Sequence, residues 1–265
     1  VDANASATLT GTATMENGKY PARASNIVVK VDGKAVSGAA SMSGSSLSVT
    51  TGTLSAGTHC VTIDVSDDAG NRTRVSATVT AGSANNVFAD TAGHWARGYA
   101  SLLNANGIMK GEIGSDGKTY FNPDRNLTRK EFAVTMARLL GLDTSYTGAM
   151  DFADDSNIPD WARGAVYAVS KAGIMQGSNS GGKLYFSPDA DMTRAEVMTV
   201  IGRCLPRGYA AAALTYSDAS SVPSWALDQV KICVSAGIIG GYQDNTLQPL
   251  GKITRGEIAK ILALF

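Results

Sequence analysis

The chain has 265 residues with 23 basic and 23 acidic side chains, so its formal net charge is zero. Six residues of each sign lie before residue 86, so the charge also balances locally. This balance argues against nucleic acid or an anionic membrane surface as a partner. No apolar run approaches the roughly 18 residues that a membrane-spanning helix needs. The length allows two or more domains.

Three cysteines, Cys60, Cys204 and Cys233, are too few and too scattered for a disulfide framework or a zinc site. The sequence therefore predicts buried or spare thiols, with no metal and no cofactor. The chain opens at Val1 with no segment that resembles a signal peptide, and we expect a leader or a larger upstream region to have been removed.

Residues 1–85 are rich in Ser, Thr, Gly and Val and contain alternating runs such as 26–32 and 58–65. Short alternating runs separated by Gly- and Ser-rich turns predict an all-β sandwich. In the second run Val61, Ile63 and Val65 share one face of a strand, which places Cys60 on the other face. We therefore expect an exposed Cys60 thiol.

The stretch Ser66-Asp-Asp-Ala-Gly-Asn-Arg72 collects turn-forming residues between two strand patterns, and Gly70 or Asn71 can adopt a positive φ there. It resembles the hairpin of bacterial immunoglobulin-like modules found on cell-surface proteins. That resemblance implies an immunoglobulin-like β-sandwich over residues 1–85. A plain turn is the preferred interpretation of Asp67 and Asp68, and calcium binding is the alternative.

From residue 86 onward the sequence repeats a unit of about 60 residues three times, over 86–149, 150–214 and 215–265. Each unit opens with an aromatic-x-Asp motif and continues with a Trp-Ala pair that begins a helical pattern. The three tryptophans are 66 and 64 residues apart: Trp95, Trp161 and Trp225. Each unit therefore predicts a first helix, a polar loop and a second helix.

A glycine pair follows the first helical pattern of each unit, twelve residues after the tryptophan. Glycine supplies the left-handed residue that ends a helix, so the first member of each pair is expected to be a helix terminator. The pairs are Gly107 and Gly111, Gly173 and Gly177, and Gly237 and Gly241. When the units are aligned, Cys204 and Cys233 fall on core positions, where a thiol behaves as a small apolar group. A disulfide between them is a disfavoured alternative.

Each second helix opens with T-R-x-E, at residues 128–131, 193–196 and 254–257. Thr followed three residues later by Glu predicts a capping box, which gives Thr128, Glu131, Thr193, Glu196, Thr254 and Glu257 a structural role. The arginine is different, because a cation at a helix N-terminus is mildly unfavourable. Beside exposed backbone N–H groups, a guanidinium can bind a carboxylate or phosphate. Arg129, Arg194 and Arg255 are therefore candidate anion ligands, with a merely structural ion pair as the alternative.

Four motifs that recur in the same order three times resemble S-layer homology domains, by which many bacteria hold surface proteins to the cell wall. The resemblance covers residues 86–265. It implies a mainly α-helical, three-pronged assembly with a central three-helix bundle. It also implies grooves that bind a secondary cell-wall polysaccharide, often one whose pyruvyl ketal carboxylate pairs with the T-R-x-E arginine.

The resemblance further implies which segments share a groove: Arg129 with 173–177, Arg194 with 237–241, and Arg255 with 107–111. Glycines let a sugar approach the backbone, and an indole can stack on a pyranose ring. The tryptophans are therefore candidate ligands, although burial in the core is the stronger reading for a Trp at a helix start. Unit 3 has a shorter loop and carries Gly240 before Gly241, so we expect unequal grooves.

Catalysis is not expected. The two histidines, His59 and His94, do not recur in the repeats, and no catalytic motif appears. The sequence therefore predicts a non-enzymatic, secreted protein of the cell surface, cell wall or S-layer. Its expected partner is secondary cell-wall polysaccharide, with peptidoglycan or other surface-layer proteins as further partners. The alternative is a structural S-layer protein or adhesin whose β-sandwich binds a partner or self-assembles.

Overall fold

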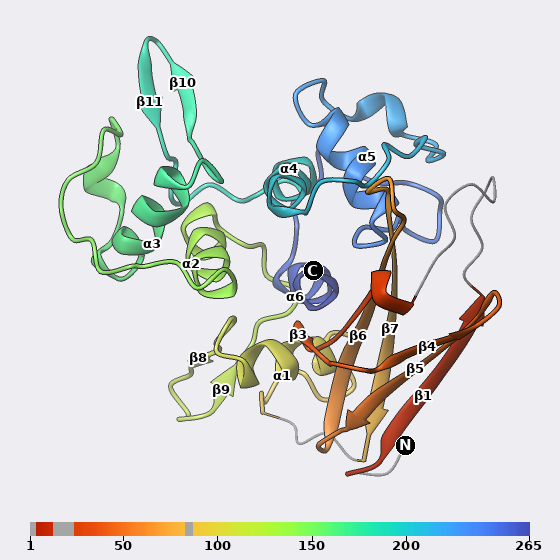
Figure 1. The fold of residues 1–265 in the computed structure, drawn as a ribbon. Coiled ribbons are helices and arrows are strands. Elements are labelled where there is room, and N and C mark those ends of the chain that lie inside the picture. The colour runs from red at the N-terminus through yellow and green to blue at the C-terminus, as the bar shows by residue number, and fades with distance from the viewer. Residues whose placement is uncertain (1–3, 13–23, 83–86) are drawn as a thin grey trace.

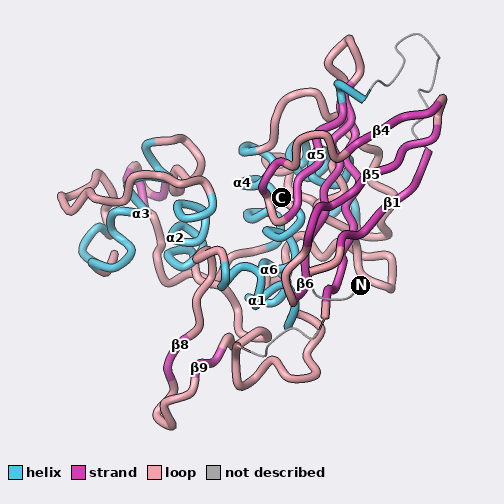
Figure 2. The backbone as a smooth tube through the Cα atoms, turned by 60° about the horizontal axis from the view of Figure 1, so that its bottom comes forward, coloured by secondary structure: helices cyan, strands magenta, loops and turns pink. Residues whose placement is uncertain are grey.

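The computed structural model describes residues 4–12, 24–82 and 87–265 (Figure 1). The predicted boundary between residues 85 and 86 lies outside the described residues. Strands occupy the N-terminal part, and helices with two small hairpins occupy the remainder (Figure 2).

The N-terminal part contains two antiparallel sheets. One has the order β1 (Ser6–Thr12), β5 (Ser46–Thr53), β4 (Ala40–Ser43). The other has the order β3 (Lys34–Ala35), β2 (Ile27–Val31), β6 (Gly57–Ser66), β7 (Arg72–Ala81), with a 3-10 turn at Ala24–Asn26 before β2. Side chains from both sheets share one core: Val29, Leu47, Val49, Val61 and Ile63. The sheets therefore pack face to face, because the apolar side of each strand needs an apolar partner.

Both faces of β6 are covered, which overturns the expectation for Cys60. Its side chain is only 1% exposed, because it packs against Leu102 and Ala263 of the helical part. Alternation within the strand placed Cys60 correctly on the face opposite Val61, but that face meets helices instead of water. Burial raises the pKa of the Cys60 thiol to about 12, so the thiol stays protonated.

The acidic pair between β6 and β7 forms a turn. One carboxylate oxygen of Asp67 accepts the N–H groups of Ala69 and Asn71 at 2.9 and 2.8 Å, and the other accepts the Asn71 amide at 2.7 Å. Gly70 supplies the positive φ, at 87°. Both carboxylate oxygens of Asp67 are thus used to close the turn.

Each repeat contributes two helices, with the second starting at the T-R-x-E arginine. The first helices are α1 (Arg97–Ala105), α3 (Asp160–Lys171) and α5 (Leu227–Ser235), and the second are α2 (Arg129–Leu139), α4 (Arg194–Cys204) and α6 (Arg255–Leu264). Units 1 and 2 carry hairpins, β8 (Glu112–Ile113) with β9 (Thr119–Tyr120) and β10 (Ser178–Ser180) with β11 (Lys183–Tyr185). Units 2 and 3 carry 3-10 turns at Asp155–Asn157 and Ala219–Ser221.

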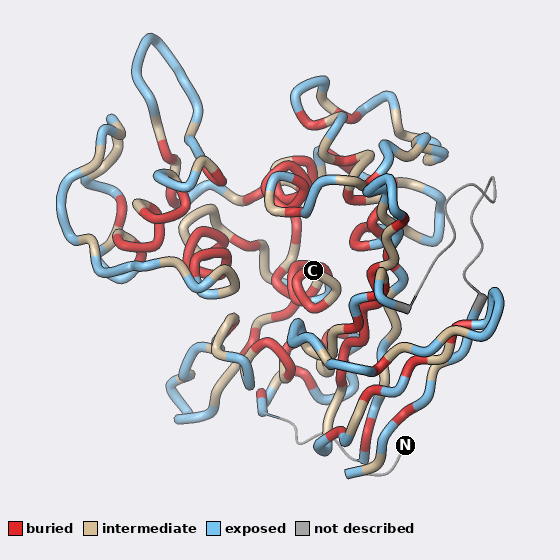
Figure 3. Tube along the Cα trace, viewed as in Figure 1, coloured by how far each residue is buried: buried red, intermediate tan, exposed pale blue. Residues whose placement is uncertain are grey.

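The helices pair across unit boundaries. Helix α2 packs on α3, α4 packs on α5, and α6 returns to pack on α1, so the three pairs form a closed ring (Figure 1). The second helices lie toward the middle and are the most deeply buried (Figure 3). One continuous apolar core runs through all three units. No unit therefore completes its own core, because each second helix needs the next unit to cover it.

A triangle of backbone hydrogen bonds ties the units together just before the second helices. The N–H of Met192 donates to the carbonyl of Leu127, that of Ile253 to Met192, and that of Leu127 to Ile253, each at 3.0 Å. Adjacent segments form isolated antiparallel bridges, such as Thr193 with Lys252. These bonds place the three T-R-x-E segments around one centre.

The β-sandwich is fixed to the helical ring by a buried polar network. Arg74 on β7 forms a two-point ion pair with Asp64 on β6, with N–O distances of 2.7 and 2.9 Å. The remaining Nη1 of Arg74 donates to the carbonyls of Leu264 and Phe265 at 3.3 and 3.0 Å, and the Tyr209 hydroxyl donates to Asp64. Strand β6 also packs on α1 and α6, which form the closing pair of the ring. The strands and helices therefore share an interface that combines a buried ion pair with helix-on-strand packing.

Candidate functional site

The T-R-x-E segments cap the second helices. The Glu carboxylate of each segment accepts the N–H of its Thr, at 2.9, 2.8 and 2.9 Å in units 1 to 3. In units 2 and 3 the Thr hydroxyl accepts the N–H of Glu196 and Glu257 at 3.2 and 3.3 Å. Reciprocal bonds of this kind satisfy two backbone donors that the helix itself leaves unpaired.

The backbone N–H groups beside the arginines are not exposed, contrary to the sequence-based expectation. The N–H of each arginine donates to a carbonyl of the loop before the next second helix, namely Ala190, Gly251 or Arg125, at 2.9 to 3.0 Å. The N–H of the following residue donates to a proline carbonyl of that loop, namely Pro188, Pro249 or Pro123. The helix N-termini are therefore closed by protein, so an external anion would have to be bound by side chains. We call each contact between a T-R-x-E segment and the next unit a seam, numbered by the unit that supplies the arginine.

The arginines of the second and third seams are buried and bonded to backbone carbonyls. Arg255 donates from Nε to Phe121 at 2.7 Å and from Nη2 to Lys110 at 2.9 Å. Arg194 donates from Nε to Leu247 at 2.9 Å and from Nη2 to Gly240 at 3.4 Å. Each guanidinium thus reaches the glycine-bounded segment of the next unit, 107–111 or 237–241. These contacts bring together the residues that the family resemblance pairs in these two seams.

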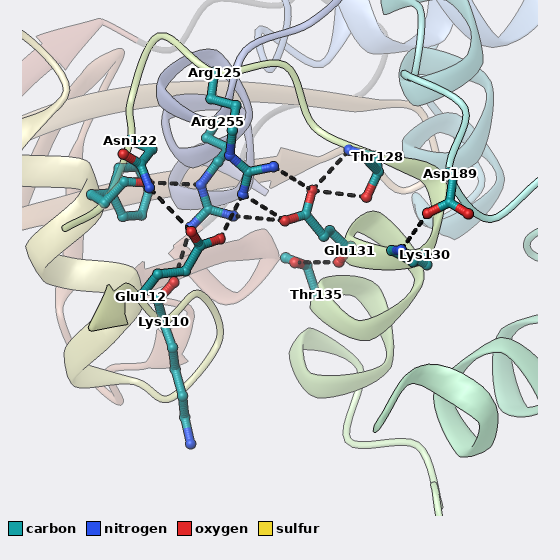
Figure 4. Close-up of polar contacts among 11 residues, drawn as sticks. Lys110, Glu112, Asn122, Arg125, Thr128, Lys130, Glu131, Thr135, Asp189 and Arg255 are labelled. Carbon is teal, nitrogen blue, oxygen red and sulfur yellow. Dashed lines mark hydrogen bonds and ion pairs between the residues drawn. The ribbon is translucent and has the colours of Figure 1, made fainter. Parts of the chain in front are cut away.

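A charged cluster completes the third seam (Figure 4). Arg125 bridges Glu131 and Glu112 at 2.6 and 2.8 Å, and Arg255 lies 3.8 Å from Glu131. Burial opposes ionisation of the Glu131 carboxyl, but hydrogen bonds from Arg125 and Thr128 outweigh it and lower its pKa. The cluster therefore pairs two arginines with two glutamates, so its formal charges balance.

The first seam differs. Arg129 lies over an aromatic ring, that of Phe186 at 5.2 Å, as the other two arginines do. Its Nη1, however, lies 3.8 Å from the Met192 sulfur and 3.4 Å from Glu196. No hydrogen bond joins Arg129 to residues 173–177, where its counterparts bind carbonyls. Instead, Arg203 of α4 donates to the Ile174 carbonyl of that segment at 3.1 Å. Unit 1 has Arg138 at the position aligned with Arg203, but unit 3 has Leu264 there, so this arginine does not recur in all three repeats.

The three tryptophans are exposed, so the prediction that they lie in the core is wrong. Trp95, Trp161 and Trp225 are 54%, 59% and 58% exposed, whereas the alanine after each is fully buried. The Trp-Ala pair therefore divides its roles, with the methyl group in the core and the indole at the surface. Trp161 lies beside Lys130, whose Nζ is 5.8 Å from the ring centroid. Trp95 lies beside Gly256, so the variable third letter of T-R-x-E faces an indole in these two seams.

Glycine is required at the two positions of each pair for different structural reasons. Gly107, Gly173 and Gly237 end the first helices with φ of 72°, 72° and 64°. A Cβ on Gly111, Gly177 or Gly241 would lie 2.6, 3.0 or 2.4 Å from the ring of the aromatic residue that opens the same unit. The second glycine therefore makes room for that ring, whatever else the segment binds.

The aspartate of each opening motif orders the loop before the second helix, a role that sequence reasoning left unassigned. Asp90 accepts the N–H groups of Phe121 and Asn122 at 2.9 and 2.6 Å. Asp154 and Asp218 bind the aligned pairs in the same way. The second residue of each pair has a positive φ of 49° to 58°: Asn122, Ser187 and Gln248. A carboxylate that holds both N–H groups stabilises this unusual backbone.

Cys204 and Cys233 are free thiols, so the alternative of a disulfide between them is wrong. Burial raises their pKa values to about 11 and about 12. Across residues 4–12, 24–82 and 87–265 no cluster of three or more His, Cys, Asp or Glu side chains is arranged to hold a metal ion. Within the same ranges no helix has the length and apolar character to cross a membrane.

Comparison with known proteins identifies relatives of the helical part. Amylopullulanase of Thermoanaerobacterium thermosulfurigenes is 30% identical over 66% of this chain and 9% of its own length. Cell surface glycoprotein 1 of Acetivibrio thermocellus is 33% identical over 58% of this chain and 7% of its own length. The cellulosome-anchoring protein of the same species is 30% identical over 54% and 32%, respectively. The chain thus spans less than a third of each of these relatives.

A sequence model of the S-layer homology domain matches residues 87–133, 151–198 and 215–259, which together exceed half of the chain. Each matched segment begins one residue before the opening motif of one unit and ends inside its second helix. The chain therefore belongs to the S-layer homology domain family and carries three copies of the domain.

Proposed function

We propose that this chain holds a bacterial surface protein to the cell wall without catalysis, by binding a secondary cell-wall polysaccharide at the seams between its repeats. The observation that carries the proposal is that all three units present an exposed indole, in two cases beside the T-R-x-E segment of the preceding unit in the ring. An indole face and a nearby cation suit a sugar ring that bears a carboxylate, such as a pyruvyl ketal. A location at the cell surface or cell wall agrees with relatives described as S-layer and cellulosome-anchoring proteins.

The domain organisation belongs to the same proposal. Residues 1–85 are assigned as an immunoglobulin-like spacer, supported by the two packed antiparallel sheets and the Asp67 turn. The units at 86–149, 150–214 and 215–265 are assigned as a three-pronged pseudo-trimer with α2, α4 and α6 as a central bundle. The hydrogen-bonded triangle and the shared core support this arrangement.

The test is a pull-down on purified bacterial sacculi, with and without chemical removal of the non-peptidoglycan polymer. We expect the chain to bind untreated sacculi and to lose binding once the polymer is removed. Binding that survives removal would contradict the polysaccharide assignment and would point to peptidoglycan.

A variant with Trp95, Trp161 and Trp225 all replaced by alanine tests the site itself. Since the indoles are more than half exposed, the fold should persist while binding falls by about tenfold or more per lost stacking contact. A variant with the exposed Val28 and Val75 of the β-sandwich replaced by alanine is the control and should bind normally. Equal binding by a folded tryptophan variant would exclude the seams as the binding surface.

A further inference from the structure

The three T-R-x-E arginines are chemically unequal, although the repeats make them look equivalent. Arg194 and Arg255 each donate from Nε and Nη2 to backbone carbonyls, and both side chains are 7% exposed. Within the described residues Arg129 donates to no backbone carbonyl and its buried Nε has no hydrogen-bond partner, and its side chain is 14% exposed. Of the three arginines in the part of the chain that the structure describes, Arg129 is the one that no carbonyl of the next unit holds.

The surroundings of Arg129 leave its charge only partly compensated. Glu196 is its nearest carboxylate at 3.4 Å, but one oxygen of Glu196 already accepts the N–H and hydroxyl of Thr193. In the third seam an extra arginine, Arg125, completes a neutral cluster, whereas the aligned residue in unit 2 is Ala190. A buried guanidinium with unpaired donors is costly unless a further acceptor arrives.

A second guanidinium, that of Arg203, lies near Arg129, as Arg125 lies near Arg255. Burial is the main cause that lowers the pKa of Arg129. The nearby charge of Arg203 lowers this pKa further, whereas Glu196 and Asp154 raise it. Arg203 is also bonded to Ile174, inside the glycine-bounded segment. Lys130, paired with Asp189, lies over the exposed Trp161 on the same seam. Three cationic side chains, the carboxylates of Glu196, Asp154 and Asp189, and one surface indole thus gather at the first seam.

We propose that the first seam is the principal anion-binding site of this chain, where Arg129 donates to a carboxylate on a sugar that stacks on Trp161, with Arg203 as the second cation. Arg194 and Arg255 are structural ties between units. The proposal rests on the proposed polysaccharide-binding function and specifies which seam performs it. It predicts a separation between binding and stability that three equivalent sites would not show.

The experiment compares Arg129→Gln, Arg194→Gln and Arg255→Gln in the full chain, with untreated sacculi as the probe. Arg129→Gln should weaken binding about ten- to hundredfold, because charge-assisted hydrogen bonds to the ligand are lost, and should leave the melting temperature unchanged or raised. Arg194→Gln and Arg255→Gln should lower the melting temperature while binding, measured well below it, stays within about threefold of the wild-type value. Arg138→Gln, on the same helix as Arg129 but exposed, is the matched control and should change neither property.

Two further measurements, on one more variant and on acid-treated sacculi, test the proposal. Arg129→Lys retains the charge without the two-point fork and should restore binding only in part. Sacculi treated with mild acid, which cleaves ketal-linked carboxylates, should bind wild type and Arg129→Gln equally weakly. If Arg194→Gln or Arg255→Gln loses binding while folded and Arg129→Gln does not, the inference is overturned and the proposed function stands. If wild type fails to bind sacculi at all, the proposed function itself fails.

Discussion

Replacement of Arg74 by alanine is expected to destabilise the chain by about 3–5 kcal/mol, because it leaves the Asp64 carboxylate buried without its partner. The same change removes the donors to the carbonyls at the end of α6. Guanidinium denaturation followed by far-UV circular dichroism, which reports on strands and helices together, measures the loss. We expect a single transition for the wild-type chain and separate transitions for the strands and helices of the variant.

Two control variants should lose much less stability than Arg74→Ala. Tyr209→Phe removes one hydrogen bond to Asp64 and should cost about 1 kcal/mol. Val75→Ala, on the same strand but exposed, should be neutral within about 0.5 kcal/mol. If Arg74→Ala unfolds at the wild-type denaturant concentration, the ion pair does not hold the two parts together.

Acid should weaken the same interface. Burial opposes ionisation of Asp64, but hydrogen bonds from Arg74 and Tyr209 outweigh it, so the pKa of Asp64 lies below its ordinary value of 3.8. A carboxylate with a lowered pKa contributes stability above pH 3.8, and that contribution is lost as the pH falls through the lowered value. Wild-type stability measured from pH 5 downward should therefore fall more steeply than that of a doubly apolar Asp64→Leu/Arg74→Met variant.

Replacement of Gly164 by alanine is the second substitution with a large expected effect. A Cβ on Gly164 would lie 1.8 Å from the carbonyl oxygen of Thr144, so either α3 or the connector from unit 1 must move. Tyr146 of that connector stacks on Tyr167 of α3 at 3.7 Å, so the two segments are docked at two points. We expect a loss of about 1–3 kcal/mol or more in the free energy of unfolding, as for overpacked cores.

Gly240→Ala is the matched control, since a Cβ there would meet nothing within 4 Å and its φ is not positive. It should be neutral or stabilise the fold by about 0.4–1 kcal/mol through the unfolded state. Thermal melts of both variants, together with near-UV circular dichroism of the stacked tyrosines, would check the pair. Equal melting temperatures would show that the connector does not approach α3 as closely as described.

Local chemistry was readable from the sequence. The capping Thr and Glu lie three residues apart, and the terminating glycine directly follows its helix, so each feature depends on neighbours along the chain. The threefold repetition then fixed the number and order of the helices. Alternation in β6 likewise separated Val61 from Cys60 correctly.

The local sequence pattern did not show which distant segment of the chain covers each strand face or helix end. Cys60 is buried because α1 and α6 cover its face, and the helix N-termini are closed because carbonyls of the next unit reach them. The tryptophans are exposed because the neighbouring alanines supply the core contact instead.

The sequence by itself determined three capped helix pairs and an S-layer homology resemblance, because those depend on short spacings that are repeated. Only the tertiary structure decided that the β-sandwich is fixed to α1 and α6, the pair of helices that closes the ring. It also decided that Arg129 differs from Arg194 and Arg255, since a guanidinium's free donors depend on carbonyls contributed by the following unit.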